Sequence, residues 1–198
     1  MGSQTCTLVV LVGLPARGKT FIASRLTRYL NWIGLETRIF NVGTYRRKMC
    51  PTDEDQTAEF FDPSNQSNNE KRDKFCEEAM KDLTKWMDEL PGRIAVLDAT
   101  NTTRKRRQRV IDAAKTEIKN DCNVFFIESI CDDPETIEKT VNECKVHGPD
   151  FANKTDKEAA AQDFIDRIEM YKKVYETIDD KFDELLSYSA FKNFSRQV

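Results

Sequence analysis

An octapeptide near the N-terminus constrains the fold more than any other feature of this 198-residue chain. Residues 13–20 read GLPARGKT and match the pattern G-x-x-x-x-G-K-[ST]. The unbroken apolar run TLVVLV precedes the pattern at residues 7–12, as expected of a strand that is covered on both faces. A helical stripe follows it at Ile22, Leu26, Leu30 and Ile33. A strand, a glycine-rich loop and a helix in this order predict a nucleotide-binding α/β fold built around a P-loop.

The residue types in the octapeptide suit the binding of a nucleoside triphosphate. Its glycines allow backbone N–H groups to close around phosphate oxygens at the positive end of a helix. We expect Lys19 to reach the β- and γ-phosphates and Thr20 to ligate Mg²⁺, so that ATP and Mg²⁺ are the predicted cofactors. The predicted nucleotide-binding residues are Gly13, Leu14, Pro15, Ala16, Arg17, Gly18, Lys19 and Thr20.

Asp98 is the second candidate catalytic residue. It directly follows the apolar run IAVL at residues 94–97, where a P-loop protein keeps the carboxylate that holds the metal or receives the acceptor's proton. Both roles stay open at this point. The alternative, that Asp98 caps the next helix, is less favoured because Thr100, Asn101, Thr102 and Thr103 are available as caps.

Short apolar runs alternate with helical stripes along the rest of the chain. Strands are predicted at residues 36–41, 94–97 and 123–129, with a weak last strand within 185–194. The stripes that predict helices are Phe75, Ala79, Leu83, Trp86 and Leu90; Ile111, Ala114 and Ile118; and Phe164, Ile168, Tyr171, Tyr175 and Ile178. A further helix is predicted from Asp133-Pro134 to about Lys145. This alternation predicts one domain with a mainly parallel sheet and helices on both faces.

Residues 51–70 form a polar, turn-rich stretch, PTDEDQTAEFFDPSNQSNNE. It is too long for a plain connection within one domain. Two interpretations remain: a mobile lid whose Phe60 and Phe61 pack when substrate is present, or a disordered loop.

The composition excludes several classes of function. With 31 Lys and Arg against 34 Asp and Glu, the net charge of −3 argues against a nucleic-acid partner. The six cysteines form no C-x-x-C pair, and His147 is the single histidine, so neither a zinc site nor a disulfide framework is predicted. His147 lies beside Gly148 and Pro149 and is predicted to be a turn residue. The start MGSQTC has no basic or apolar signal region, and no apolar stretch is long enough for a membrane helix, so we expect a cytoplasmic protein without a membrane partner.

Arginines gather just beyond two of the predicted strands. Arg46 and Arg47 follow the strand at 36–41, and the run from Arg104 to Arg109 follows Asp98. Ligands bind at the carboxyl ends of strands in open α/β sheets, and arginine forks match phosphate oxygens. We therefore expect an acceptor that itself carries phosphate, with one or two arginines of the 104–109 run in the site and the rest in water. A solvated helix face or a nucleic-acid patch are the alternatives for this run.

Four motifs, VGLPARGKT, FNVGTYRR, DATNTTRKRR and FFIESICDDP, resemble the 6-phosphofructo-2-kinase domain of the bifunctional 6-phosphofructo-2-kinase/fructose-2,6-bisphosphatase family. The resemblance covers essentially the whole chain. It implies a P-loop nucleoside-triphosphate-hydrolase-like fold of the mononucleotide kinase type. It also implies MgATP-dependent phosphorylation of fructose 6-phosphate at the 2-hydroxyl to fructose 2,6-bisphosphate, a regulator of glycolysis. Homodimer formation stays open.

The resemblance also implies site residues. Fructose 6-phosphate contacts are implied for Arg46, Arg72, Thr100, Arg106, Lys145, Arg167 and Tyr171. Nucleotide contacts are implied ahead of and at Lys145, for Thr140, Asn142, Glu143 and Lys145. Implied catalytic residues are Lys19, Asp98, Lys145 and Cys131, of which Cys131 aligns with the family's active-site cysteine only after an insertion. A small buried hydrophobe is the alternative for Cys131.

The family's phosphatase half works through an Arg-His-Gly motif and a second histidine. Here the single histidine lies in Val146-His147-Gly148, so we expect residues 1–198 to form one kinase domain without the phosphatase domain. Two other functions stay open: a P-loop kinase for another phosphorylated acceptor such as a polynucleotide 5′ end, and a nucleotide-binding module without turnover.

Overall fold

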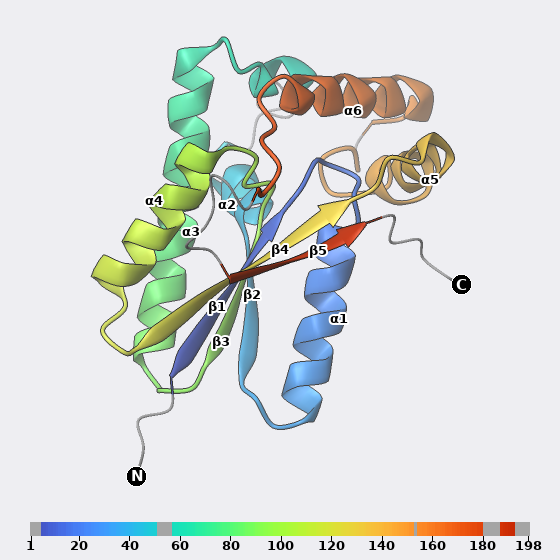
Figure 1. The fold of residues 1–198 in the computed structure, drawn as a ribbon. Coiled ribbons are helices and arrows are strands. Elements are labelled where there is room, and N and C mark those ends of the chain that lie inside the picture. Colours follow the sequence, from blue (N-terminus) through green and yellow to red (C-terminus); the bar gives the residue numbers. More distant parts are fainter. Residues whose placement is uncertain (1–4, 51–56, 153, 180–186, 193–198) are drawn as a thin grey trace.

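Five parallel strands form the centre of the computed structural model, which describes residues 5–50, 57–152, 154–179 and 187–192 (Figure 1). The strands are β1 (Cys6–Val12), β2 (Thr37–Asn41), β3 (Ile94–Asp98), β4 (Cys122–Ile130) and β5 (Ser187–Lys192). Their spatial order is β2-β3-β1-β4-β5. The chain order reverses around β1 and β3, and such a switch point places a ligand site at the carboxyl ends of these strands. The predicted mainly parallel sheet is confirmed.

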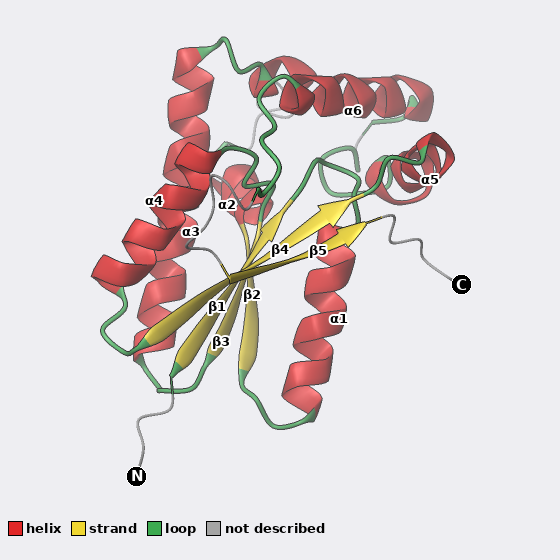
Figure 2. Cartoon of the chain, in the orientation of Figure 1, coloured by secondary structure: helices red, strands yellow, loops and turns green. Residues whose placement is uncertain are grey.

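Helices cover both faces of the sheet, as the sequence predicts (Figure 2). On one face, α3 (Gln66–Asp88) and α4 (Arg104–Glu117) pack with Leu8, Val10 and Leu97 in the largest core. On the other face, α1 (Lys19–Trp32) packs against Val9 and Leu11. Alternate residues of β1 thus enter different cores, which is why the strand is an unbroken apolar run.

A second group of elements lies over the carboxyl ends of the strands (Figure 1). It consists of α2 (Val42–Met49), the 3₁₀ turn η2 (Ala58–Phe61), α5 (Pro134–Thr140), the π-helical turn η3 (Val141–Lys145) and α6 (Lys157–Lys172). Val141, Phe151, Phe164 and Ile168 form one small core of this group. These elements cover the carboxyl ends of the strands and form the walls of a site there.

The predicted loop at 51–70 is wrong for residues 66–70, which form the first turns of α3. Asn65 caps this helix by accepting the N–H of Asn68, and polar residues are tolerated there because the first turns are largely exposed. Phe60 and Phe61 lie buried in η2, where they pack with Phe75. Residues 51–56 lie outside the described part of the chain.

Five residues of the predicted helical stripes lie beyond their helices. Ile33 and Ile118 are the C-cap residues of α1 and α4, and three others lie further out. Leu90 follows α3 and is exposed, while Tyr175 and Ile178 follow α6, which ends at Lys172. The chain instead turns back to the sheet because the buried Glu128 of β4 accepts hydrogen bonds from the hydroxyls of Tyr175 and Thr177 and from the N–H of Ile178. These hydrogen bonds to Glu128 therefore direct the chain back to the sheet, although the spacing of apolar residues predicts a longer helix. Of the predicted last strand, residues 187–192 are confirmed as β5.

Among the described residues, no helix combines the length and the apolar character that crossing a membrane requires.

Candidate active site

The P-loop connects β1 to α1 through a backbone that only certain residues allow. Gly13 has a φ of 138°, and a Cβ at this position would lie 2.4 Å from the carbonyl oxygen of Ser129 on β4. Gly18 has a left-handed φ of 78° and is the N-cap of α1. The two glycines of the motif thus let the loop pass close to β4 and turn into the helix.

Replacing Gly13 by alanine is expected to weaken ATP binding about tenfold or more, because the new Cβ displaces backbone that is predicted to hold phosphate. Gly34→Ala is the matched control, since Gly34 also has a positive φ of 88° but a Cβ there meets nothing within 4 Å. We expect this control to keep its ATP affinity and to lose only about 1 kcal/mol of stability. Calorimetric titration with ATP and thermal unfolding measure both effects, and equal ATP affinity in the two variants would contradict the assignment.

Lys19 lies buried at the start of α1 and donates a hydrogen bond of 2.5 Å to the carbonyl oxygen of Leu14. Burial lowers the pKa of its ammonium group to about 7; Asp98 opposes this shift, whereas Lys145 and Arg17 add to it. A polyphosphate in the loop would place negative charge beside these cations and favour the charged form.

A cleft of about 570 Å³ extends from the P-loop across the carboxyl ends of β2 and β3 to α6. Its size suits a small-molecule ligand. Residues from the P-loop, α2, α3, α4, η3 and α6 line it. The walls of the cleft therefore come from segments that are distant in the sequence and become neighbours in the fold.

Asp98 ends β3 at the floor of this cleft and is 4% exposed. The side-chain amide of Asn41, its register partner at the end of β2, donates a hydrogen bond of 2.6 Å to Oδ2. Asp98 does not cap a helix, because the N-cap of α4 is Thr103. The remaining carboxylate oxygen of Asp98 accepts no hydrogen bond from the described residues, so it is available to a ligand.

The residues present fit a magnesium ion. The hydroxyl of Thr20 and the carboxylate of Asp98 line the same cleft, beside the loop that would hold phosphate. Both are hard oxygen ligands, and Mg²⁺ in such sites is bound by one or two protein oxygens together with substrate phosphate and water.

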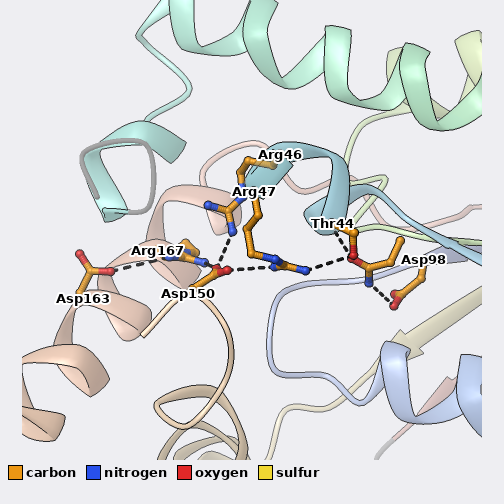
Figure 3. A network of polar contacts seen from close by, with 8 residues as sticks. Thr44, Arg46, Arg47, Asp98, Asp150, Asp163 and Arg167 are labelled. Atoms are coloured by element: carbon orange, nitrogen blue, oxygen red, sulfur yellow. Dashed lines mark hydrogen bonds and ion pairs between the residues drawn. The ribbon is translucent and has the colours of Figure 1, made fainter. Parts of the chain in front are cut away.

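Three arginines converge on one carboxylate at the far end of the cleft (Figure 3). Asp150 accepts hydrogen bonds from Arg46 at 2.6 Å, from Arg47 at 2.9 Å and from Arg167 at 2.7 Å. The ring of Phe61 lies beside this cluster, 4.4 Å from the guanidinium carbon of Arg167 and 5.4 Å from that of Arg46. Arg46 and Arg167 are each 5% exposed, so this end of the cleft is largely shielded from solvent and carries mostly positively charged groups.

The structure brings all seven of the implied acceptor residues together. The cleft is lined by Arg46, Arg72, Thr100, Arg106, Lys145, Arg167 and Tyr171, which come from six parts of the chain. Arg72 donates to the carbonyl oxygen of Phe61 at 2.9 Å, and Arg106 forms an ion pair with Asp73. These contacts fix both guanidinium groups at the wall.

The implied nucleotide contacts are only partly brought together. Lys145 lines the cleft, whereas Thr140, Asn142 and Glu143 do not, and Asn142 and Glu143 are exposed. In the P-loop, Gly13 and Leu14 lie outside the lining, while Pro15, Ala16, Arg17, Gly18, Lys19 and Thr20 belong to it. Cys131 is buried, 6% exposed, and does not line the cleft, which favours its packing role.

The run from Arg104 to Arg109 is divided between the cleft and the protein interior. Lys105, Arg106 and Arg109 line the cleft. Arg107 was expected in water, but it is 1% exposed and donates to the carbonyl oxygen of Glu176 at 2.8 Å. A guanidinium can be buried in this way because the backbone carbonyl groups of Glu176 and Asn101 accept hydrogen bonds from its Nη1.

Three residues of the cleft were not anticipated from the sequence: Asn41, Phe61 as a support for arginines, and Asp150. Asn41 had a weak signal, since it ends a predicted strand. Asp150 had none, because it lies in a turn 17 residues before Arg167 and meets the arginines only in three dimensions. His147 lies exposed in the same turn, as the sequence predicts.

A family model described as 6-phosphofructo-2-kinase matches residues 1–198. The chain belongs to the 6-phosphofructo-2-kinase family. It is 47% identical over 182 residues to 6-phosphofructo-2-kinase/fructose-2,6-bisphosphatase 4 of Rattus norvegicus, covering 92% of this chain and 38% of the relative. It is 43% identical over 192 residues to 6-phosphofructo-2-kinase/fructose-2,6-bisphosphatase of Caenorhabditis elegans, covering 96% of this chain and 41% of the relative. The chain thus spans about two fifths of the length of these curated relatives.

The fold of this 6-phosphofructo-2-kinase family member also occurs in other kinases. The structure of the APS kinase CysC of Mycobacterium tuberculosis with AMPPNP and APS matches it with a TM-score of 0.53 at 13% identity. The match covers 84% of this chain and 99% of the APS kinase. The predicted P-loop kinase fold and the predicted family are confirmed.

Proposed function

We propose that this chain transfers the γ-phosphoryl group of ATP to the 2-hydroxyl of fructose 6-phosphate and releases ADP and fructose 2,6-bisphosphate. The observation that carries the proposal is the buried pair of Arg46 and Arg167, which lies in the same cleft as the P-loop. The P-loop accounts for one phosphorylated substrate. The arginine pair accounts for a second one, whose 6-phosphate it binds as a spectator group.

In the proposed step, the 2-oxygen of the sugar forms a bond to the γ-phosphorus, and the bond between this phosphorus and the β,γ-bridging oxygen breaks. The proton of the 2-hydroxyl leaves to the solvent or to Asp98. Lys19 and Lys145 border the transfer site and stabilise the negative charge on the transferred group and on ADP. The 2-hydroxyl is anomeric and more acidic than an ordinary alcohol. Positioning and charge neutralisation therefore supply most of the catalysis.

Asp98 differs from the other two carboxylates of the cleft lining. Arginines hold Asp73 and Asp150, whereas the neutral amide of Asn41 holds Asp98. We propose that Asp98, with Thr20, holds Mg²⁺, which neutralises charge on the ATP phosphates when bound. Acceptance of the hydroxyl proton by Asp98 is the second role that this geometry allows.

The structure gives less support to a polynucleotide acceptor. Of the basic run after Asp98, Arg107 is buried, Arg104 pairs with Glu176, and Arg106 and Arg109 pair with Asp73. The run is thus not an open basic patch of the kind that binds a phosphate backbone. A binding module without turnover is also less favoured, because Lys19, Asp98 and Lys145 all line one cleft.

An ADP-release assay with a panel of acceptors tests the proposed function. The panel contains fructose 6-phosphate, glucose 6-phosphate, free fructose and an oligonucleotide with a 5′-hydroxyl. We expect fructose 6-phosphate to give by far the highest kcat/KM. Preferential phosphorylation of the oligonucleotide would replace the proposal by the polynucleotide alternative, and acceptor-independent or absent turnover would support the module without transfer activity.

A further inference from the structure

Asp150 is the one acid that touches all three arginines at the acceptor end of the cleft, among the residues the structure describes (Figure 3). Its Oδ2 accepts from both Arg46 and Arg167, and its Oδ1 accepts from Arg47. Arg46 and Arg47 belong to α2 and Arg167 to α6. A single carboxylate therefore joins two helices that the chain does not connect directly.

The turn that carries Asp150 is held firmly in place. Phe151, the next residue, is 1% exposed, packs against Phe164 and closes a turn by donating its N–H to the carbonyl oxygen of Gly148. A shift of the backbone at Asp150 would move this buried ring. The turn thus fixes the backbone of Asp150, and the three arginine contacts hold its carboxylate.

The charges of the cluster require such an acid. Three guanidinium groups lie together in a largely buried region, where like charges repel strongly. Asp163 helps only at Arg167, from 3.8 Å, and its other oxygen accepts the N–H of Ala58. Burial raises the pKa of Asp150, but Arg46 and Arg167 outweigh this effect and lower the pKa to about 2. The carboxylate is therefore charged at neutral pH.

We infer that Asp150 is a positioning residue for the acceptor's phosphate. It holds the guanidinium groups of Arg46 and Arg167 side by side at the wall of the cleft, where they receive a phosphate dianion. This inference rests on the proposed function, in which that phosphate is the 6-phosphate of the sugar. It assigns to Asp150 a part in acceptor affinity and selectivity, without contact with the reacting atoms.

The test compares Asp150→Asn, which keeps the shape but loses the charge, with wild type. We expect KM for fructose 6-phosphate to rise about tenfold or more, as when charge-assisted hydrogen bonds lose their geometry, and KM for ATP to stay within about twofold. We expect kcat at saturating sugar phosphate to change little, because the Asn41–Asp98 contact does not involve Asp150. The preference for fructose 6-phosphate over free fructose should fall by a similar factor.

Asp156→Asn is the matched control. It makes the same change on an exposed acid that caps α6, where asparagine is an equally good cap. We expect wild-type KM values for both substrates. If Asp150 only competed with the substrate's phosphate, Asp150→Asn would instead lower KM for fructose 6-phosphate, and this result or an unchanged KM would overturn the inference.

Two further measurements separate this inference from the proposed function. Calorimetric titration of wild type and Asp150→Asn with fructose 6-phosphate measures acceptor binding without turnover. Binding that weakens in the variant supports the positioning role even if wild type fails to make fructose 2,6-bisphosphate, whereas no binding to wild type overturns both. Should Asp150→Asn not fold, a wild-type crystal structure with fructose 6-phosphate decides. The inference requires Asp150 to keep its contacts with Arg46 and Arg167 beside the bound phosphate, and displacement of its carboxylate would refute it.

Discussion

Lys19→Met is expected to reduce kcat for phosphoryl transfer about 10²-fold or more, since removal of one charged contact from a phosphoryl-transfer site has an effect of this size. Lys19 lies at the start of α1 in the P-loop, with its ammonium group buried among Leu14, Asp98 and Lys145. Methionine fills a similar volume without the charge, so the loop keeps its packing. ATP binding should weaken as well, because we expect the ammonium group to contact the phosphates of bound ATP before transfer as well as during it.

Lys115→Met on the exposed side of α4 is the matched control and should leave both kcat and ATP binding unchanged. Steady-state kinetics and calorimetric titration measure the two effects. Near-normal kcat in Lys19→Met would contradict the assignment of the P-loop as the nucleotide site.

The pH dependence of ATP binding follows from the same lysine. Because the pKa of Lys19 is lowered to about 7, its ammonium group loses its proton in the free protein as the pH rises above 7. Phosphate binding favours the charged form, so ATP affinity should fall between pH 7 and pH 9. The slope should be smaller in Lys19→Met, and equal slopes in the two proteins would mean that another group causes the pH dependence.

Arg167→Ala is expected to raise KM for fructose 6-phosphate about 10²-fold, while KM for ATP stays within about twofold. The 6-phosphate does not react, so its contacts stabilise the ground state and the transition state to the same extent and act mainly on KM. The guanidinium group of Arg167 is buried beside Phe61 and Phe151 and is held by Asp150. Its loss removes a guanidinium group that we propose binds the phosphate, and it leaves the partly buried Asp150 carboxylate with fewer partners. A lower melting temperature should accompany the kinetic effect.

Arg109→Ala provides the comparison, since Arg109 also lines the cleft but its side chain is 49% exposed and pairs with Asp73 at the surface. Exposed ion pairs contribute little, so both KM values and the melting temperature should stay close to wild type. Lost ATP affinity with unchanged sugar affinity in Arg167→Ala would show that the acceptor site is placed wrongly.

The features that the sequence predicted correctly are those with a local signal. The P-loop needs only a spacing of glycines, a lysine and a threonine between a strand and a helix. The unbroken apolar run of β1 reflects burial on both faces of the sheet, and the stripe Phe75, Ala79 and Leu83 of α3 reflects one buried helix face. Asp98 was found because it directly follows an apolar strand.

The features that were missed depend on contacts between distant segments. The end of α6 was predicted too late, because Glu128 draws Tyr175 and Ile178 back to the sheet from 47 and 50 residues away along the chain. Arg107 was expected in water because a helical wheel cannot show the carbonyl groups of Asn101 and Glu176. Asp150 could not be paired with Arg46, which is 104 residues earlier, without the fold.

The position of the new phosphate tests the central claim most directly. A phosphate on the anomeric 2-oxygen is a hemiketal phosphate, which mild acid cleaves, whereas a phosphate ester at the 1-position survives the same treatment. We expect ATP and fructose 6-phosphate to give a bisphosphate that returns fructose 6-phosphate on brief acidification, and Lys19→Met to make it at least about 10²-fold more slowly. An acid-stable bisphosphate would place the transfer on the 1-hydroxyl and contradict the proposed 2-kinase activity.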